Sequence, residues 1–116
     1  MNTEHYILEI ARICHEANKA FCESIGDFSQ VSWDTAPDWQ KNAAIHNVNY
    51  IIAHPEVSYE ALHDYWMQEK INTGWSYGAI KDEVAKTHPS MIPFEQLSKE
   101  EQQKDKLFFA IVQALK

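Results

Sequence analysis

The stretch that decides the fold runs from His63 to Lys106 and reads HDYWMQEKINTGWSYGAIKDEVAKTHPSMIPFEQLSKEEQQKDK. It gathers aromatic rings and cationic or basic side chains in one part of an acidic chain; these residues are Trp66, Trp75, Tyr77, Lys70, Lys81, Lys86 and His88. Aromatic faces stack on flat molecules, and ammonium groups neutralise anionic ones. The stretch therefore predicts a site for a flat, anionic small molecule.

Caps and helix breakers divide this stretch into elements. Ser58 predicts the start of a helix that runs through Lys70, and Gly74 ends it. Trp66 and Lys70 then lie one turn apart on one face of that helix. A ring and a cation on the same face could share one ligand.

The segment that follows is expected to be irregular or extended. Residues 75–80 carry aromatic side chains at alternate positions, which favours a short strand or an extended turn. Residues 81–86 are compatible with one helical turn, whereas the two prolines of residues 88–94 favour extended backbone. Ser98 with Glu101 then has the spacing of a capping box for a last helix to Leu115, the end of its apolar repeat.

Two further helices are predicted before this stretch. Residues 3–25 carry apolar side chains at a spacing of three or four, and Gly26 follows as a stop signal. Pro37 is expected as the first residue of a second helix, which ends near residue 53 because Pro55 disfavours the helical conformation before it. The sequence thus predicts a mainly α, compact four-helix fold with one short irregular segment between helices three and four.

Length and composition predict one domain over residues 1–116. The net charge of −7, from 17 acidic and 10 basic residues, disfavours binding to a nucleic acid polymer. The apolar runs are far shorter than the roughly 20 residues of a membrane span, and the start of the chain lacks the pattern of a signal peptide. We therefore expect a cytoplasmic protein with no membrane partner.

Metal and catalytic sites are not predicted by the residue spacing. His46, His54 and His63 lie eight and nine residues apart, and no zinc or nucleophile motif is present. Cys14 and Cys22 are expected to be reduced, partly buried thiols, since they lie about 12 Å apart along one helix. The sequence predicts no enzyme activity, no metal and no cofactor.

The order of motifs HDYW, GWSYG, KD, KTHP and IPFEQL, followed by a capped helix, resembles the ryanodine-receptor (RyR) domain family. The resemblance divides the chain into an RyR-like core at residues 58–116 and a helical extension at residues 1–57. It implies a ligand-sensing or interaction module, with adenine-nucleotide binding in some members. Such domains occur in tandem pairs in large calcium channels and singly in small bacterial and phage proteins, and this chain is similar to the latter.

The resemblance also assigns roles to individual residues. It implies that Trp66 stacks on an adenine ring and that Lys81 faces a phosphate, where the family often has Arg. Lys70 stands where a cation is usual, and Asp105 where a polar residue of the last helix faces the site. Asp105 could accept a hydrogen bond from an amino or hydroxyl group, but it would repel a nearby phosphate.

Structural roles remain open for several of these residues. Trp75 and Tyr77 are expected either to line the site or to pack in the core, and Trp66 either to reach a ligand or to be enclosed. Lys81 and Lys86 are compatible with a solvated surface. His88, which precedes Pro89, is expected either as a hydrogen-bonded scaffold residue or as a ligand contact. The function predicted first is binding of an anionic, nucleotide-like ligand, for sensing or sequestration in a phage or prophage setting. The alternative is an interaction module in which the same aromatic surface forms a homodimer.

Overall fold

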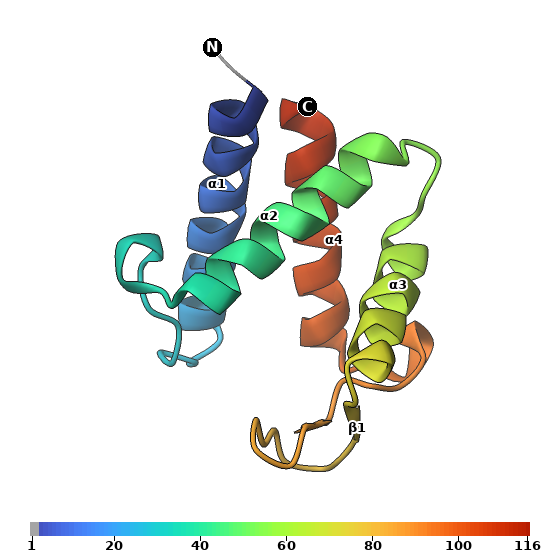
Figure 1. Ribbon diagram of the computed structural model, residues 1–116. Coiled ribbons are helices and arrows are strands. Elements are labelled where there is room, and N and C mark those ends of the chain that lie inside the picture. Colours follow the sequence, from blue (N-terminus) through green and yellow to red (C-terminus); the bar gives the residue numbers. More distant parts are fainter. Residues whose placement is uncertain (1–2) are drawn as a thin grey trace. The chain divides into compact units, whose positions relative to one another are not determined.

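The computed structural model describes residues 3–116, and Figure 1 shows a mainly helical chain. The described α-helices are α1 (Thr3–Ser24), α2 (Asp38–Ala53), α3 (Tyr59–Asn72) and α4 (Lys99–Leu115). Between them lie the short strands β1 (Ser76–Tyr77) and β2 (Thr87–His88) and the 3-10 helices η1 (Trp33–Thr35) and η2 (Phe94–Gln96). The predicted mainly α fold with four helices is confirmed. None of the described helices is long and apolar enough to cross a membrane.

The chain divides into two compact units. The first comprises the described residues up to Glu56 together with Lys106–Lys116, and the second comprises Val57–Asp105. In the first unit α1 packs against α2, and its fully buried side chains are Ile10, Cys14, Cys22, Val48, Ile51 and Val112. Both cysteines are free and buried, as predicted. Burial raises the pKa of the Cys14 thiol to about 12, so this thiol stays protonated and unreactive.

The loop between α1 and α2 is more ordered than its turn-forming residues predicted. Trp33 is buried within η1, and its ring makes an edge contact with His15 at a centroid distance of 5.6 Å. The Nε2 atom of His15 lies 2.7 Å from the carbonyl oxygen of Val31. Helix α2 begins at Asp38 with Pro37 as its N-cap, so the prediction of Pro37 as the first helical residue was wrong by one position.

The second unit begins with α3, whose two ends follow the predicted caps. The hydroxyl of Ser58 accepts a hydrogen bond from the backbone N–H of Ala61 at 3.1 Å. The helix continues to Asn72, and Gly74 follows with φ of +92°, a conformation that favours glycine. Helix α3 packs against η2, and the buried side chains of this unit are Leu62, His63, Met91, Phe94 and Leu97.

The segment between α3 and α4 is built around a short parallel pairing of β1 with β2, in which Ser76 is opposite Thr87. The helical turn expected at residues 81–86 does not form. Instead, the Asp82 carboxylate accepts hydrogen bonds from the N–H groups of Val84 and Ala85 at 2.9 and 3.1 Å. Asp82 and Thr87 also exchange two backbone hydrogen bonds of 3.0 Å. A side chain that captures backbone donors in this way competes with a helix.

Helix α4 begins as predicted, because the hydroxyl of Ser98 accepts a hydrogen bond from the N–H of Glu101 at 3.2 Å. The amino group of Lys104 donates a hydrogen bond of 3.0 Å to the carboxylate of Glu101, so this carboxylate binds a side chain one turn further along the helix. The N-terminal residues of α4, through Asp105, belong to the second unit.

We predict that Gly78→Ala loosens the β1–β2 segment. A Cβ atom at this position would lie 2.5 Å from the Cβ atom of Thr87, so the backbone must shift, at a cost of about 1–3 kcal/mol. Amide hydrogen exchange of residues 76–88 should accelerate. Gly26→Ala is the control, because an added Cβ there meets nothing within 4 Å. Its only cost is the unfavourable φ of +89° for alanine, so exchange of residues 76–88 should stay as in wild type. Unchanged exchange in the Gly78 variant would contradict the prediction.

Candidate functional site

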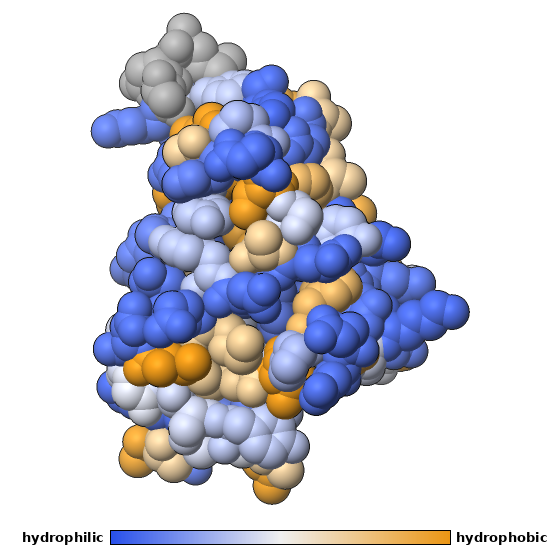
Figure 2. All heavy atoms as spheres, turned by 90° about the vertical axis from the view of Figure 1, so that its right-hand side faces the viewer, coloured by the Kyte–Doolittle hydropathy of each residue, from blue (hydrophilic) through white to orange (hydrophobic). Residues whose placement is uncertain are grey.

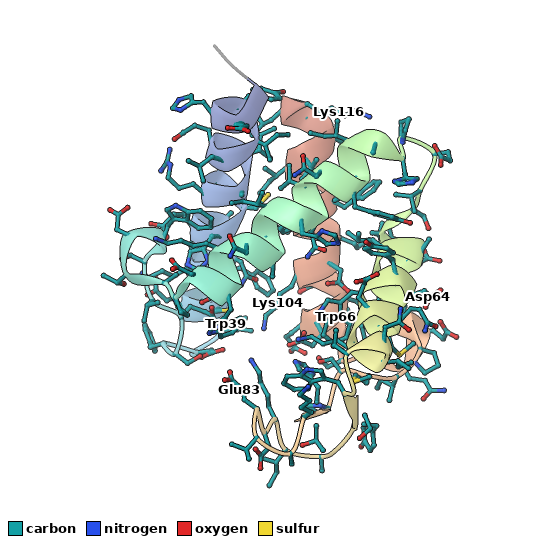
Figure 3. The ribbon with its side chains drawn as sticks, in the orientation of Figure 1. Trp39, Asp64, Trp66, Glu83, Lys104 and Lys116 are labelled. Carbon is teal, nitrogen blue, oxygen red and sulfur yellow. The ribbon has the colours of Figure 1, made fainter. Side chains whose placement is uncertain are left out.

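Three rings of the predicted site lie in contact within the second unit. The rings of Trp66 and His88 meet edge to face at a centroid distance of 5.1 Å and an interplanar angle of 78°. The rings of Trp75 and His88 lie 6.4 Å apart at 58°. Trp66 also stacks on His63, at 5.5 Å and 27°. Figure 3 shows Trp66 and Asp64 on opposite sides of α3, so the rings gather on one side of this helix.

Lys70 joins the two tryptophans, as its position one turn after Trp66 predicted. Its amino nitrogen lies 4.3 Å from the centroid of the Trp75 ring and 6.0 Å from that of Trp66. Attraction between a cation and the ring faces holds the amino group there. Burial lowers the pKa of Lys70, and the positive charge of Lys81 lowers it further. The partly buried ammonium group therefore lacks full solvation.

His88 contributes a hydrogen-bond donor with a defined position. The backbone N–H of Ser90 donates to Nδ1 of His88 at 3.0 Å, so a neutral ring carries its proton on Nε2. Burial lowers the pKa of His88, and the charges of Lys81 and Lys70 act in the same direction. At neutral pH, His88 is therefore an uncharged ring with one Nε2–H donor.

The remaining two lysines of the predicted site differ in their surroundings. Lys81 is exposed, and its charge acts on both Lys70 and His88, which places it close to the rings. The amino group of Lys86 instead donates a hydrogen bond of 2.9 Å to the carbonyl oxygen of Thr73, just after α3. Lys86 also has a positive φ of 58°. Its observed contact is therefore a structural one at the end of this helix, and its ligand role stays a prediction.

Trp75 and Tyr77 were each predicted either to line the site or to pack in the core, and they differ in exposure. Trp75 is half-buried among the rings, whereas the Tyr77 side chain is 59% exposed. Tyr77 is therefore not a core residue, and its position in β1 is opposite His88 in β2. Trp66 is also half-buried, so it is not enclosed by the apolar core.

Asp105 contacts this region through His63, a residue that was not among the predicted site residues. His63 is 6% exposed, and its Nε2 atom lies 2.7 Å from the carbonyl oxygen of Ile92. Its Nδ1 atom lies 3.8 Å from Oδ2 of Asp105, whose side chain is 35% exposed. Burial raises the pKa of Asp105 to about 6, against the opposing effect of His63. The sequence feature that could have identified His63 as part of the site is its position three residues before Trp66, on the same face of the helix.

A metal site is not supported by the described part of the chain. Within residues 3–116, no group of three or more His, Cys, Asp or Glu side chains is arranged to hold a metal ion. We call Trp66, Lys70, Trp75 and His88 the ring cluster. Its chemistry is that of stacking surfaces, one cation and one neutral donor.

A family model for the RyR domain matches residues 43–115, more than half of the chain. The chain belongs to the RyR domain family. The RyR domain match begins within α2 and covers the whole of the second unit. Every residue of the ring cluster therefore lies within the RyR domain, and the resemblance read from the sequence motifs is confirmed.

We predict that Asp105→Asn changes how the stability of this RyR domain depends on pH. The pKa of Asp105 is raised from 3.8 to about 6 in the folded chain, so between these values the folded state binds more protons than the unfolded state. The free energy of unfolding of the wild-type chain therefore falls as pH rises through this window. The full shift corresponds to about 3 kcal/mol, which exposure of a third of the side chain reduces to on the order of 1 kcal/mol.

Urea denaturation at pH 4.5, 5.5, 6.5 and 7.5 measures this effect. The stability of the Asn variant relative to wild type should increase across the series. Asp64→Asn removes an exposed carboxyl from α3, in the same unit of the chain, and should leave the profile unchanged. A constant difference between wild type and the Asp105 variant at all four pH values would contradict the prediction.

Proposed function

We propose that this RyR domain is a non-catalytic module that binds a small, anionic, nucleotide-like ligand at the ring cluster. The observation that carries the proposal is the position of Lys70, half-buried over two indole rings. Lys81 adds a second positive charge nearby. A binding site for a flat anion needs both features, a ring surface and a cation beside it.

The charges around Lys70 support an anionic ligand. Among the described residues, no carboxylate lies within ion-pair distance of Lys70, although Glu83 exerts a weaker favourable effect. Burial and the repulsion from Lys81 both disfavour its charged form. A bound phosphate would offset both effects, so ligand binding and protonation of Lys70 should favour each other.

Each member of the site has a proposed role. Trp66 provides the stacking surface for an adenine-type ring, with Trp75 beside it. Lys70 and Lys81 bind the anionic group as point charges, and Nε2–H of His88 donates to an acceptor on the ligand. Asp105 accepts a hydrogen bond from an amino or hydroxyl group. The roles of Trp66, Lys70, Lys81 and Asp105 follow the family resemblance. Those of Trp75 and His88 follow from their contacts in the ring cluster.

Absence of catalysis is part of the proposal. The Cys14 thiol is buried with a pKa of about 12, and His63 is enclosed and hydrogen-bonded, so both lack the access that a nucleophile or base needs. Binding without reaction fits a protein that senses or sequesters its ligand. A phage or prophage origin and a cytoplasmic location belong to the same proposal.

We predict that nucleotides stabilise the wild-type protein and that Trp66→Ala abolishes the effect. Adenosine mono- and diphosphates and cyclic dinucleotides are tested by thermal shift, because a ligand at 100 times its Kd stabilises by about 2.7 kcal/mol. Trp39→Ala is the matched control, since it removes an indole that is 54% exposed in the first unit. Its ligand-induced shift should equal that of wild type.

Lys70→Met extends this test to the cation. It keeps most of the length of the side chain and removes its charge, so the affinity for the responding nucleotide should fall at least tenfold, about 1.4 kcal/mol. Lys99→Met is the control, because Lys99 is exposed at the first position of α4. Equal affinities of the two lysine variants, or no shift with any nucleotide in wild type, would rule out the proposed ligand class.

A second candidate function is self-association through the loop between β1 and β2. Ile80 and Val84 are 79% and 96% exposed on this loop, and Asp82 holds its backbone in a defined turn. Figure 2 shows hydrophobic surface at its lower edge, at the height where Figure 1 shows this loop. Lys81 and Glu83 give the loop charges of both signs, so two antiparallel copies would place unlike charges opposite each other.

We predict for this second candidate that light scattering gives twice the monomer mass at high protein concentration. Val84→Glu places a carboxylate at the exposed position and should shift the equilibrium to monomer without loss of thermal stability. Leu8→Glu is the control, since Leu8 is 42% exposed on α1. A wild-type monomer at all concentrations would exclude the homodimer.

A further inference from the structure

The buried His63 ring has two different partners for its two nitrogen atoms. Nε2 lies 2.7 Å from the carbonyl oxygen of Ile92. A carbonyl only accepts hydrogen bonds, so Nε2 must carry a proton and donate. In a neutral ring the other nitrogen, Nδ1, is then an unprotonated acceptor, and it lies 3.8 Å from Oδ2 of Asp105.

At 3.8 Å the two atoms are within ion-pair distance but beyond hydrogen-bond distance, and this arrangement favours one proton on the pair. An ionised Asp105 facing an unprotonated Nδ1 would place two acceptors opposite each other, which is unfavourable in a largely buried position. One proton, bound either to Nδ1 of His63 or to Oδ2 of Asp105, removes this conflict. On Nδ1 it makes an imidazolium–carboxylate pair, and on Oδ2 it makes a carboxylic acid that faces a neutral ring.

The His63 ring is also the surface on which Trp66 rests. The two rings stack at 5.5 Å and 27°, and Phe94 meets His63 edge to face at 6.1 Å. A change in the position of His63 is therefore transmitted to the Trp66 indole through direct contact.

We propose that His63 and Asp105 share one proton behind Trp66, and that this proton sets the position of the indole in the ring cluster. His63 is then a positioning residue, and its effect on ligand binding rests on the proposed function of Trp66. The shared proton itself requires no ligand.

The surroundings of Asp105 place the titration of its carboxyl near pH 6. Burial is the largest effect on Asp105 and raises its pKa to about 6; among its neighbours, His63 and Lys104 lower that pKa and Glu101 raises it. Lys104 and Glu101 are themselves paired at 3.0 Å, so their effects partly offset. The charge of His63 also acts on His88. The indole position should therefore change as pH rises through about 6.

NMR of the ligand-free protein tests this coupling. The indole N–H signal of Trp66 is assigned by its absence in Trp66→Phe, and its chemical shift is followed from pH 4.5 to 8. In wild type we expect a titration with a midpoint near pH 6. Asp105→Asn and His63→Gln should each abolish it, because each removes one member of the pair while keeping a polar side chain of similar size. Asp64→Asn, on the opposite side of α3, should retain it.

His88 provides the competing explanation, because its ring also contacts Trp66 and also titrates. His88→Gln should therefore leave the wild-type midpoint in place. The proposal is overturned if Trp66 does not titrate, if the titration persists in Asp105→Asn, or if His88→Gln alone removes it. If Asp105→Asn does not fold, His63→Gln decides between the same outcomes. Because no ligand is present, a failure to bind nucleotides leaves this result unaffected.

Discussion

The hydrogen bond from His63 to the carbonyl of Ile92 joins α3 to the chain segment that leads into η2, across 29 residues of sequence. Both partners lie within the second unit. A buried donor or acceptor left without a partner costs about 1–3 kcal/mol, so this contact restricts how α3 and the returning chain can pack. The same contact fixes the orientation of the imidazole, and the imidazole in turn supports Trp66. The stacking surface of the candidate site thus depends on a hydrogen bond made by His63, the residue on which Trp66 stacks.

The electrostatics of the site are local and differ in sign from the net charge of the chain. Charges separated by more than about 10 Å are largely screened at ordinary ionic strength, so the net charge of −7 does not prevent an anion from binding to one basic cluster. What matters at the ring cluster is partial burial, which weakens solvation of Lys70 and His88. The acidic remainder of the chain instead disfavours long polyanions, which would contact more than this one region.

Local sequence signals predicted those parts of the fold whose cause is local. Ser58, Ser98 and Gly74 act within one helical turn, and the structure shows each of them at the predicted helix end. The proximity of Lys70 to Trp66 followed from helical spacing for the same reason. The parallel pairing of Ser76 with Thr87 could not be predicted in this way, because its register depends on how the loop between them closes. The contact of His63 with Ile92 likewise requires knowledge of which distant segment returns to α3.

The three lysines of the candidate site show why residue type alone could not assign roles. Lys86 donates to the carbonyl of Thr73, so moving it to a ligand would leave that carbonyl without this donor. Lys70 already lies over the Trp75 ring, where it can contact an anion without leaving the ring face. Lys81 is exposed yet close enough to affect the charge of Lys70. An anion that binds between Lys70 and Lys81 would reduce their mutual repulsion, whereas one that recruits Lys86 must first break an existing hydrogen bond. The geometry therefore favours Lys70 and Lys81 over Lys86 as the cations of the proposed anion site.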